Sequence, residues 1–175
     1  MIGGDRLDDV IESLCRMDLP TCLRICAGTD GSVTHLLELM TGQVVRVKTL
    51  QQQVIEASDE IAGLLGTSAG DAVNERTVLL CAGDMVYVYA RSLVPINRMP
   101  AGMESDLTRA DIPIGRILKK YAIESRREID AVEIFESRVF GEECVVLSRT
   151  YRIIHDKMAL MWINEVFPTD SRWNL

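Results

Sequence analysis

Residues 144–168, CVVLSRTYRIIHDKMALMWINEVFP, decide the fold of this 175-residue chain. β-Branched and aromatic residues fill both halves of the stretch, and His155-Asp156-Lys157 separates them. This composition predicts two strands, over residues 144–154 and 158–167, joined by a tight turn. Two strands joined by so short a turn pair antiparallel, because a parallel pair needs a crossover of a dozen residues or more.

The rest of the chain is also predicted to contain strands joined by short turns, together with several helices. A second hairpin runs through Ala82-Gly83-Asp84, and helices are expected where apolar residues recur every three or four positions. Short links between neighbouring strands predict an α+β fold, an antiparallel sheet with flanking helices. The expected strands are residues 43–55, 76–81, 85–94, 129–140, 144–154 and 158–167, the expected helices are 6–17, 32–42, 58–66 and one from Pro113, and residues 100–111 are expected to form an irregular flap.

Composition and charge narrow the function classes. With 47% apolar residues, the chain has enough for one core, so residues 1–175 are expected to form a single domain with a helical extension over 1–27. The net charge of -7 disfavours binding to nucleic acids and to anionic membrane surfaces. No apolar run is long enough to span a bilayer, and residues 1–6 do not resemble a signal peptide, which favours a cytoplasmic protein.

The cysteines favour free thiols over a metal site. There are five of them, an odd number, without a CxxC pair, and only two histidines could add imidazole ligands. We therefore expect neither a metal nor a disulfide framework.

Two strongly apolar segments each carry one lone charge, and the charges are opposite. Arg91 lies in residues 86–95 and Glu165 in residues 159–168. A charge in a buried strand is costly unless it meets a partner or a ligand, so the pair indicates an interior polar site. There the arginine would hold a carboxylate and the glutamate would handle a hydroxyl or a proton. The alternatives are an edge arginine paired on the surface and an exposed glutamate near a strand end.

Other charges fit structural roles. Arg149 and Arg152 are three apart on one strand and so lie on opposite faces, where sheet salt bridges are expected. Lys119-Lys120 and Arg126-Arg127 are expected to be solvated. The sequence contains no phosphate-binding glycine loop and no nucleophile–base motif.

Taken in order, several short segments resemble the chorismate lyases, in particular a divergent chorismate-lyase-like branch of archaea and some bacteria. The resemblance covers about residues 28–167. It is carried by Asp30-Gly31-Ser32-Val33-Thr34, Arg76-Thr77-Val78-Leu79-Leu80-Cys81-Ala82-Gly83, Ala90-Arg91-Ser92-Leu93-Val94-Pro95, Ile112-Pro113-Ile114-Gly115-Arg116, residues 147–154 and Ile163-Asn164-Glu165-Val166-Phe167-Pro168.

The resemblance implies a six-stranded antiparallel sheet around a ligand cavity under helical flaps. It also implies elimination of pyruvate from chorismate to give 4-hydroxybenzoate, without a metal or organic cofactor. By this resemblance Arg91 binds the ring carboxylate, helped by backbone N–H groups at Val33 and Ile114, beside which lies Gly115. Glu165 contacts the ring hydroxyl. Val33 replaces a methionine of the bacterial enzymes, and the shorter loop between Arg91 and Ile114 implies a different flap.

Two other functions stay open at this point. The effector-binding domains of some transcription regulators resemble this fold and only bind small molecules, although they normally follow a winged helix, for which the residues before Gly28 are too few and too acidic. A lyase acting on a related enolpyruvyl compound, or making another hydroxybenzoate isomer, would keep the same residues. The oligomeric state and the downstream pathway are not fixed by the sequence.

Overall fold

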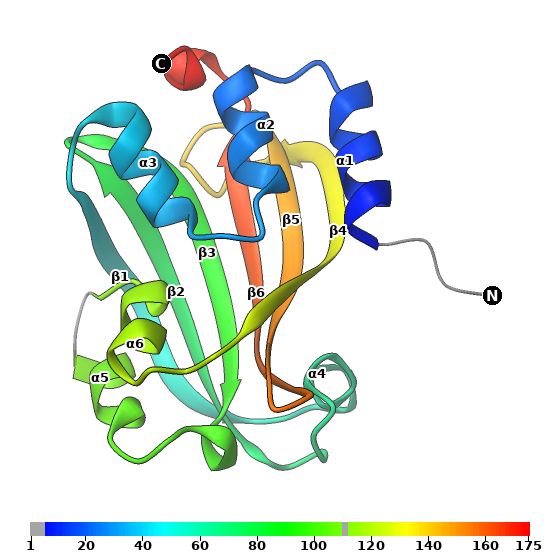
Figure 1. Ribbon diagram of the computed structural model, residues 1–175, viewed down its shortest axis with the longest axis vertical. Coiled ribbons are helices and arrows are strands. Elements are labelled where there is room, and N and C mark those ends of the chain that lie inside the picture. Colours follow the sequence, from blue (N-terminus) through cyan, green and yellow to red (C-terminus); the bar gives the residue numbers. More distant parts are fainter. Residues whose placement is uncertain (1–5, 110–111) are drawn as a thin grey trace.

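The computed structural model describes residues 6–109 and 112–175 (Figure 1). Most of the segment tested for a signal peptide, and Ala110 and Asp111 of the expected flap, lie outside the described residues. The helices are α1 (Arg6–Arg16), α2 (Thr21–Gly28), α3 (Val33–Thr41), α4 (Asp59–Leu65), α5 (Met103–Arg109) and α6 (Ile114–Lys120), with short 3-10 turns at Ile96–Arg98 and Ser171–Trp173. The strands are β1 (Val45–Glu56), β2 (Ala72–Ala82), β3 (Met85–Pro95), β4 (Arg126–Ser137), β5 (Cys144–His155) and β6 (Met158–Pro168).

All six strands join one antiparallel sheet, in the order β1-β2-β3-β6-β5-β4. The α+β class predicted from the sequence is confirmed. The β5–β6 hairpin has a two-residue turn, with Asp156 at φ 48° and Lys157 at φ 66°. Left-handed backbone at both central residues gives the turn the twist that two paired strands need. The pairing of β3 with β6 brings the two predicted hairpins together at the centre of the sheet.

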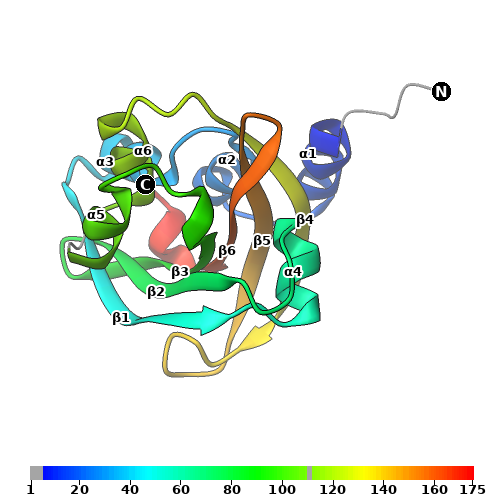
Figure 2. The ribbon, with the colours of Figure 1, turned by 90° about the horizontal axis from the view of Figure 1, so that it is seen from below.

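The sheet curves around helices α2, α3 and α6, which cover its inner face (Figure 2). Leu23, Leu37 and Ile117 from these helices belong to one core cluster with Leu147 and Phe167 of the sheet. Helix α3 begins and ends as the sequence predicts: Ser32 accepts a hydrogen bond from the His35 N–H, and Gly42 closes the helix at φ 66°. Helix α4 packs on the opposite, outer face against Leu93 and Trp162.

Two helices were not expected. Residues 103–109, predicted to be an irregular flap, form α5, so that prediction is wrong for this part of the segment. The stretch is mostly polar, so the sequence showed little sign of a helix; in the structure, Met103 and Leu107 of α5 are its buried residues. Helix α2 lies within the N-terminal extension and places Cys22 and Cys26 one turn apart.

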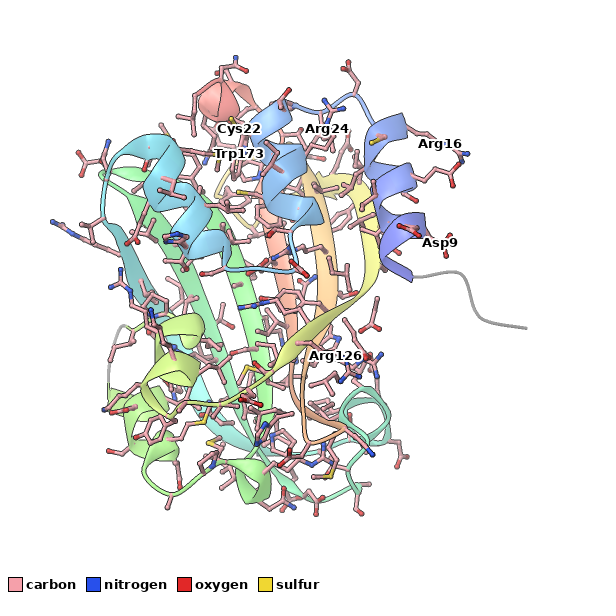
Figure 3. The ribbon with its side chains drawn as sticks, viewed as in Figure 1. Asp9, Arg16, Cys22, Arg24, Arg126 and Trp173 are labelled. Carbon is pink, nitrogen blue, oxygen red and sulfur yellow. The ribbon has the colours of Figure 1, made fainter. Side chains whose placement is uncertain are left out.

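The N-terminal helix and the C-terminus both pack on the sheet. Val10 and Leu14 of α1 are buried, and the helix contacts β4 and α2. Trp173, labelled in Figure 3, is 1% exposed. It packs edge-on against Tyr87, at 5.2 Å between ring centroids, and Phe167, at 6.0 Å. Among residues 6–109 and 112–175, no helix is long and apolar enough to cross a membrane.

Candidate active site

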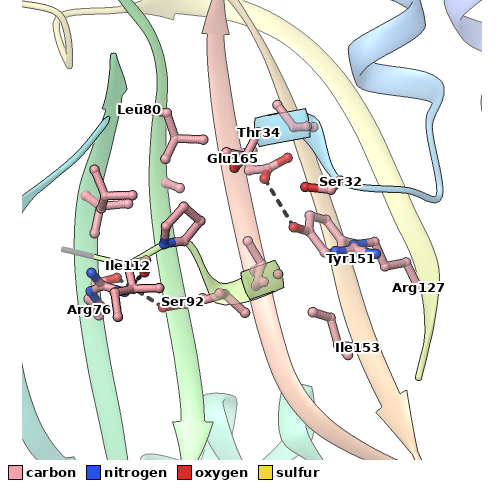
Figure 4. A pocket seen from close by; sticks show the side chains of 18 residues that line it. Ser32, Thr34, Arg76, Leu80, Ser92, Ile112, Arg127, Tyr151, Ile153 and Glu165 are labelled. Carbon is pink, nitrogen blue, oxygen red and sulfur yellow. Dashed lines mark hydrogen bonds between the residues drawn. The ribbon is translucent and has the colours of Figure 1, made fainter. Parts of the chain in front are cut away.

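A cavity lies between the inner face of the sheet and the first turns of α3 and α6 (Figure 4). Its walls are mostly aliphatic, with a few polar side chains set into them. A largely apolar cavity with a few convergent polar groups is the usual form of a small-molecule site. The aliphatic residues are Val33, Val47, Val78, Leu80, Ala90, Ile112, Pro113, Ile114, Ile153 and Ile163, and the side chains with polar groups are Ser32, Thr34, Arg76, Ser92, Arg127, Tyr151 and Glu165.

The sheet register brings the polar residues to one face. Arg76 lies opposite Ser92, Ala90 lies opposite Glu165, and Glu165 lies opposite Arg149 on its other side. Directly opposed residues of neighbouring strands point to the same face. Strands β2, β5 and β6 therefore present Arg76, Arg149 and Glu165 to the same face of the sheet.

Glu165 is held by a buried ion pair. The Arg149 Nε donates to Glu165 Oε2 at 2.7 Å, and the two side chains are only 1% and 8% exposed. The Tyr151 hydroxyl donates to the other carboxylate oxygen at 3.1 Å. With both oxygens accepting hydrogen bonds, Glu165 is arranged as a carboxylate beside its counterion.

Arg149 also fixes the end of α2 to the sheet. Its Nη1 donates to the carbonyls of Cys26, Ala27 and Thr29 at 2.9, 3.0 and 2.9 Å. These carbonyls belong to the last turn of the helix and the residue after it, where helix carbonyls lack intrahelical donors and a positive charge is favourable.

Burial and neighbouring charges shift the pKa values of Arg149 and Tyr151. Burial alone lowers the pKa of a guanidinium, but the adjacent Glu165 and Tyr151 outweigh it, and the pKa of Arg149 is raised. Burial, followed by the negative charge of Glu165, raises the pKa of the Tyr151 hydroxyl far above its ordinary value. Arg149 is therefore a permanent cation, and Tyr151 is a permanent hydrogen-bond donor to Glu165.

Arg76 is the cation on the other side of the cavity (Figure 4). It is 2% exposed, and its guanidinium donates to the Ile112 carbonyl at 3.1 Å and to the Thr49 hydroxyl at 3.2 Å. These contacts fix the plane of a group that carries five N–H donors in a rigid fork.

Arg91 does not lie in the cavity, and the prediction that it does is wrong. Its guanidinium pairs with Glu75 at 2.6 Å, on the outer face, and its side chain is 39% exposed. Its neighbours Ala90 and Ser92 line the cavity instead. Residues two apart in a strand share a face, and Leu93, two residues after Arg91, packs with α4 on the outer face.

The other predicted site residues lie where they were expected. Glu165, Val33, Ile114 and Gly115 all line the cavity. Val33 and Ile114 begin α3 and α6, so their N–H groups are among those that a helix leaves without an internal acceptor. Which ligand atoms these residues contact stays a prediction.

Sequence reasoning missed four residues of the site: Arg76, Arg127, Arg149 and Tyr151. Arg149 and Arg152 do lie on opposite faces as predicted, with Arg152 paired to Asp130 at 2.8 Å. The signal for Arg76 was available, since it precedes the apolar run from Val78 to Ala82. Arg127, expected to be solvated, gave no such signal because it lies in a polar stretch at the start of β4.

The five cysteines are free thiols, as the sequence indicates. Cys26 is fully buried beside Arg149, and burial raises its pKa to about 12. Among residues 6–109 and 112–175, no three His, Cys, Asp or Glu side chains are grouped to hold a metal ion.

The fold is shared with the "ligand-binding domain of a putative GntR-family transcriptional regulator" from Bordetella bronchiseptica, with a TM-score of 0.60 at 16% identity, over 72% of this chain and 85% of that chain. PhnF from Mycobacterium smegmatis superposes with a TM-score of 0.63 at 15% identity, over 79% of this chain and 64% of that chain. The separate structure of the effector domain of PhnF gives a TM-score of 0.62 at 16% identity, over 82% of this chain and 91% of that chain. At such identities the likeness establishes the fold alone.

The sequence comparisons identify a specific family among the proteins that share this fold. The chain belongs to the Rv2949c-like chorismate pyruvate-lyase family, whose model matches residues 28–175. It is 32% identical to "Putative lyase MJ0807" of Methanocaldococcus jannaschii, over 82% of this chain and 76% of that protein. It is 29% identical to the chorismate pyruvate-lyase of Mycobacterium leprae, over 61% of this chain and 51% of that one.

Proposed function

We propose that this protein is a chorismate pyruvate-lyase, which converts chorismate to 4-hydroxybenzoate and pyruvate. The observation that carries the proposal is a cavity with a fixed cation, Arg76, on one side and a fixed carboxylate, Glu165, on the other. Chorismate has a matching polarity, with a carboxylate at one end of its ring and a hydroxyl at the other. Membership of the family supports the same activity.

Arg76 binds the ring carboxylate in this proposal. A guanidinium fork holds a carboxylate through two parallel hydrogen bonds and so orients the ring as well as attracting it. The first N–H groups of α3 and α6, at Val33 and Ile114, add further donors from the helical side of the cavity. Arg76 takes the role that the sequence assigned to Arg91.

Glu165 contacts the hydroxyl at the far end of the ring. In the reaction the C–O bond to the enolpyruvyl group breaks, and its electron pair leaves with the side-chain oxygen. The ring carbon that bears the hydroxyl loses a proton, the ring becomes aromatic, and the released enolate takes up one proton at its methylene carbon to become pyruvate. The carboxyl group of Glu165, held in place by Arg149 and Tyr151, is placed to assist this proton movement.

The test is a chromatographic assay of chorismate consumption and of both products. We expect Arg76→Met to lower kcat/KM roughly 10- to 150-fold, the equivalent of about 1.5–3 kcal/mol for a hydrogen bond to a charged group. Glu165→Gln should lower kcat roughly 100-fold or more. Arg91→Ala, on the outer face, is the matched control and should keep the wild-type rate.

Three outcomes would contradict the proposal. Saturable binding of 4-hydroxybenzoate without turnover would indicate a sensor domain. Release of pyruvate together with another hydroxybenzoate isomer, or from a different enolpyruvyl compound only, would indicate a related lyase. Full activity of Arg76→Met would remove Arg76 from the site. Because Glu165→Gln disturbs a buried ion pair, its near-ultraviolet circular dichroism should be compared with that of the wild type, and Tyr151→Phe offers a milder change at the same carboxylate.

A further inference from the structure

A second hollow adjoins the cavity on its helical side, between α3 and α6. The two share five lining residues, which form the boundary between them: Ser32, Thr34, Pro113, Gly115 and Arg127. Of these five, only Arg127 has a charged side chain. It comes from the start of β4, and Figure 4 shows it across the cavity from Arg76.

Arg127 is held in place, yet it keeps hydrogen-bonding capacity. Its Nη1 donates to the Asp30 carbonyl at 3.2 Å, and its guanidinium carbon lies 6.0 Å from the centroid of the Tyr151 ring. Its Nε is buried and has no hydrogen-bond acceptor within the described part of the chain. In that same part, no carboxylate lies within ion-pair distance of Arg127.

The adjacent arginine differs on each point. Arg126 is 64% exposed at its side chain and pairs with Glu128 at 2.6 Å on the surface (Figure 3). Arg127 is instead a half-buried cation beside the Tyr151–Glu165 pair, and no carboxylate of the described residues lies close enough to neutralise it. A guanidinium in such a place is suited to an anionic ligand group.

We propose that Arg127 binds the second carboxylate of the substrate, the one on its enolpyruvyl side chain. This inference rests on the proposed function. Chorismate carries two carboxylates, and with the ring carboxylate at Arg76 and the ring hydroxyl at Glu165, the side chain must project sideways from the ring. Arg127 lies beside Tyr151, whose hydroxyl donates to Glu165, at the side of the cavity that borders the second hollow, where a side chain on the neighbouring ring carbon has room.

This role makes Arg127 a determinant of selectivity. The substrate has the second carboxylate, and the aromatic product does not. Arg127 therefore adds affinity for chorismate without adding affinity for 4-hydroxybenzoate, and it holds the leaving group in one orientation while the C–O bond breaks.

The experiment compares two ligands in three proteins: the wild type, Arg127→Met and Arg126→Met. The KM for chorismate and the inhibition constant for 4-hydroxybenzoate are measured in each. We expect Arg127→Met to raise KM roughly 10- to 150-fold, as for the loss of a charge-assisted hydrogen bond. Its inhibition constant should stay within about 3-fold of the wild-type value, which also shows that the cavity is intact. Arg126→Met should match the wild type in both.

Two results in an active enzyme would overturn the inference. An Arg127→Met protein with unchanged KM would show that the residue does not contact the substrate. Equal weakening of both ligands would place it on the ring carboxylate or in the fold instead. Absence of turnover in the wild type would overturn the proposed lyase activity separately. Calorimetric affinities for chorismate and 4-hydroxybenzoate would then decide the role of Arg127, and failure of the wild type to bind either ligand would overturn both.

Discussion

Replacing Arg149 with methionine tests whether the buried ion pair is built as the structure indicates. The side chain is 1% exposed and makes hydrogen bonds to Glu165 and to three carbonyls at the end of α2. Methionine fills much of the same volume without a charge. The substitution leaves the carboxylate of Glu165, 8% exposed, without its counterion.

The expected loss of stability is large. Removing one partner of a buried ion pair costs about 3–5 kcal/mol, because the remaining charge is buried without compensation. The three carbonyls lose a donor as well, which adds to this cost wherever water cannot reach them. Total stabilities of such domains are about 5–15 kcal/mol, so the variant should fold but unfold at much lower urea concentration. The fluorescence of the buried Trp173 provides the signal.

Arg152→Met is the matched control. Arg152 is three residues away on the same strand, faces the other side of the sheet, and pairs with Asp130 with its side chain 28% exposed. Its removal should cost no more than about 1 kcal/mol. The double variant Arg149→Met/Glu165→Gln should lose less stability than the two single variants lose together. The difference, the coupling free energy, should be about 1–3 kcal/mol. A loss for Arg149→Met as small as that of the control, or additive single losses, would refute the reasoning.

Three further predictions concern other parts of the molecule. Trp173→Ala should destabilise the protein by about 3–5 kcal/mol, since it removes an indole packed on Tyr87 and Phe167; a loss under about 1 kcal/mol in urea unfolding would contradict this packing. At pH 8 a disulfide reagent should label the exposed Cys15 quickly and Cys26 only after unfolding, and rapid labelling of native Cys26 would count against its burial. The pKa of Cys26 is about 12 in the folded protein and about 9 in the unfolded chain, so the buried thiol contributes fully to stability below pH 9 and this contribution is lost as the pH rises toward 12. The free energy of unfolding of Cys26→Ala should therefore fall less steeply between pH 9 and 12 than that of the wild type. An equally steep fall in both proteins would contradict the raised pKa.

The sequence was enough to predict the sheet. The hairpins follow from alternating β-branched and aromatic residues and from turns as short as Asp156-Lys157, signals that lie within a few residues of each other. Helix α5 escaped because its stretch is polar and short. The register irregularity between Leu80 and Cys81 was not predicted either, because an extra residue in one strand depends on how that strand pairs with its partner.

Site residues were harder to predict than strands, since a lone charge in an apolar strand reveals burial but not the face on which it lies. Glu165 and Arg91 gave the same signal in the sequence, and only Glu165 faces the cavity. The positions of Arg76 and Arg149 follow from pairing across β2, β3, β6 and β5, which no single segment contains.

Arg149 links the N-terminal extension to the candidate site. The family resemblance begins at residue 28, yet two of the carbonyls that accept hydrogen bonds from this guanidinium belong to Cys26 and Ala27, just before it. The same guanidinium orients Glu165 in the cavity. A buried ion pair contributes little net stability compared with well-packed apolar residues, so its value lies in fixing one arrangement of the carboxylate. Helix α2 is thereby part of the support of the site, and the orientation of Glu165 depends on residues outside the segment that identifies the family.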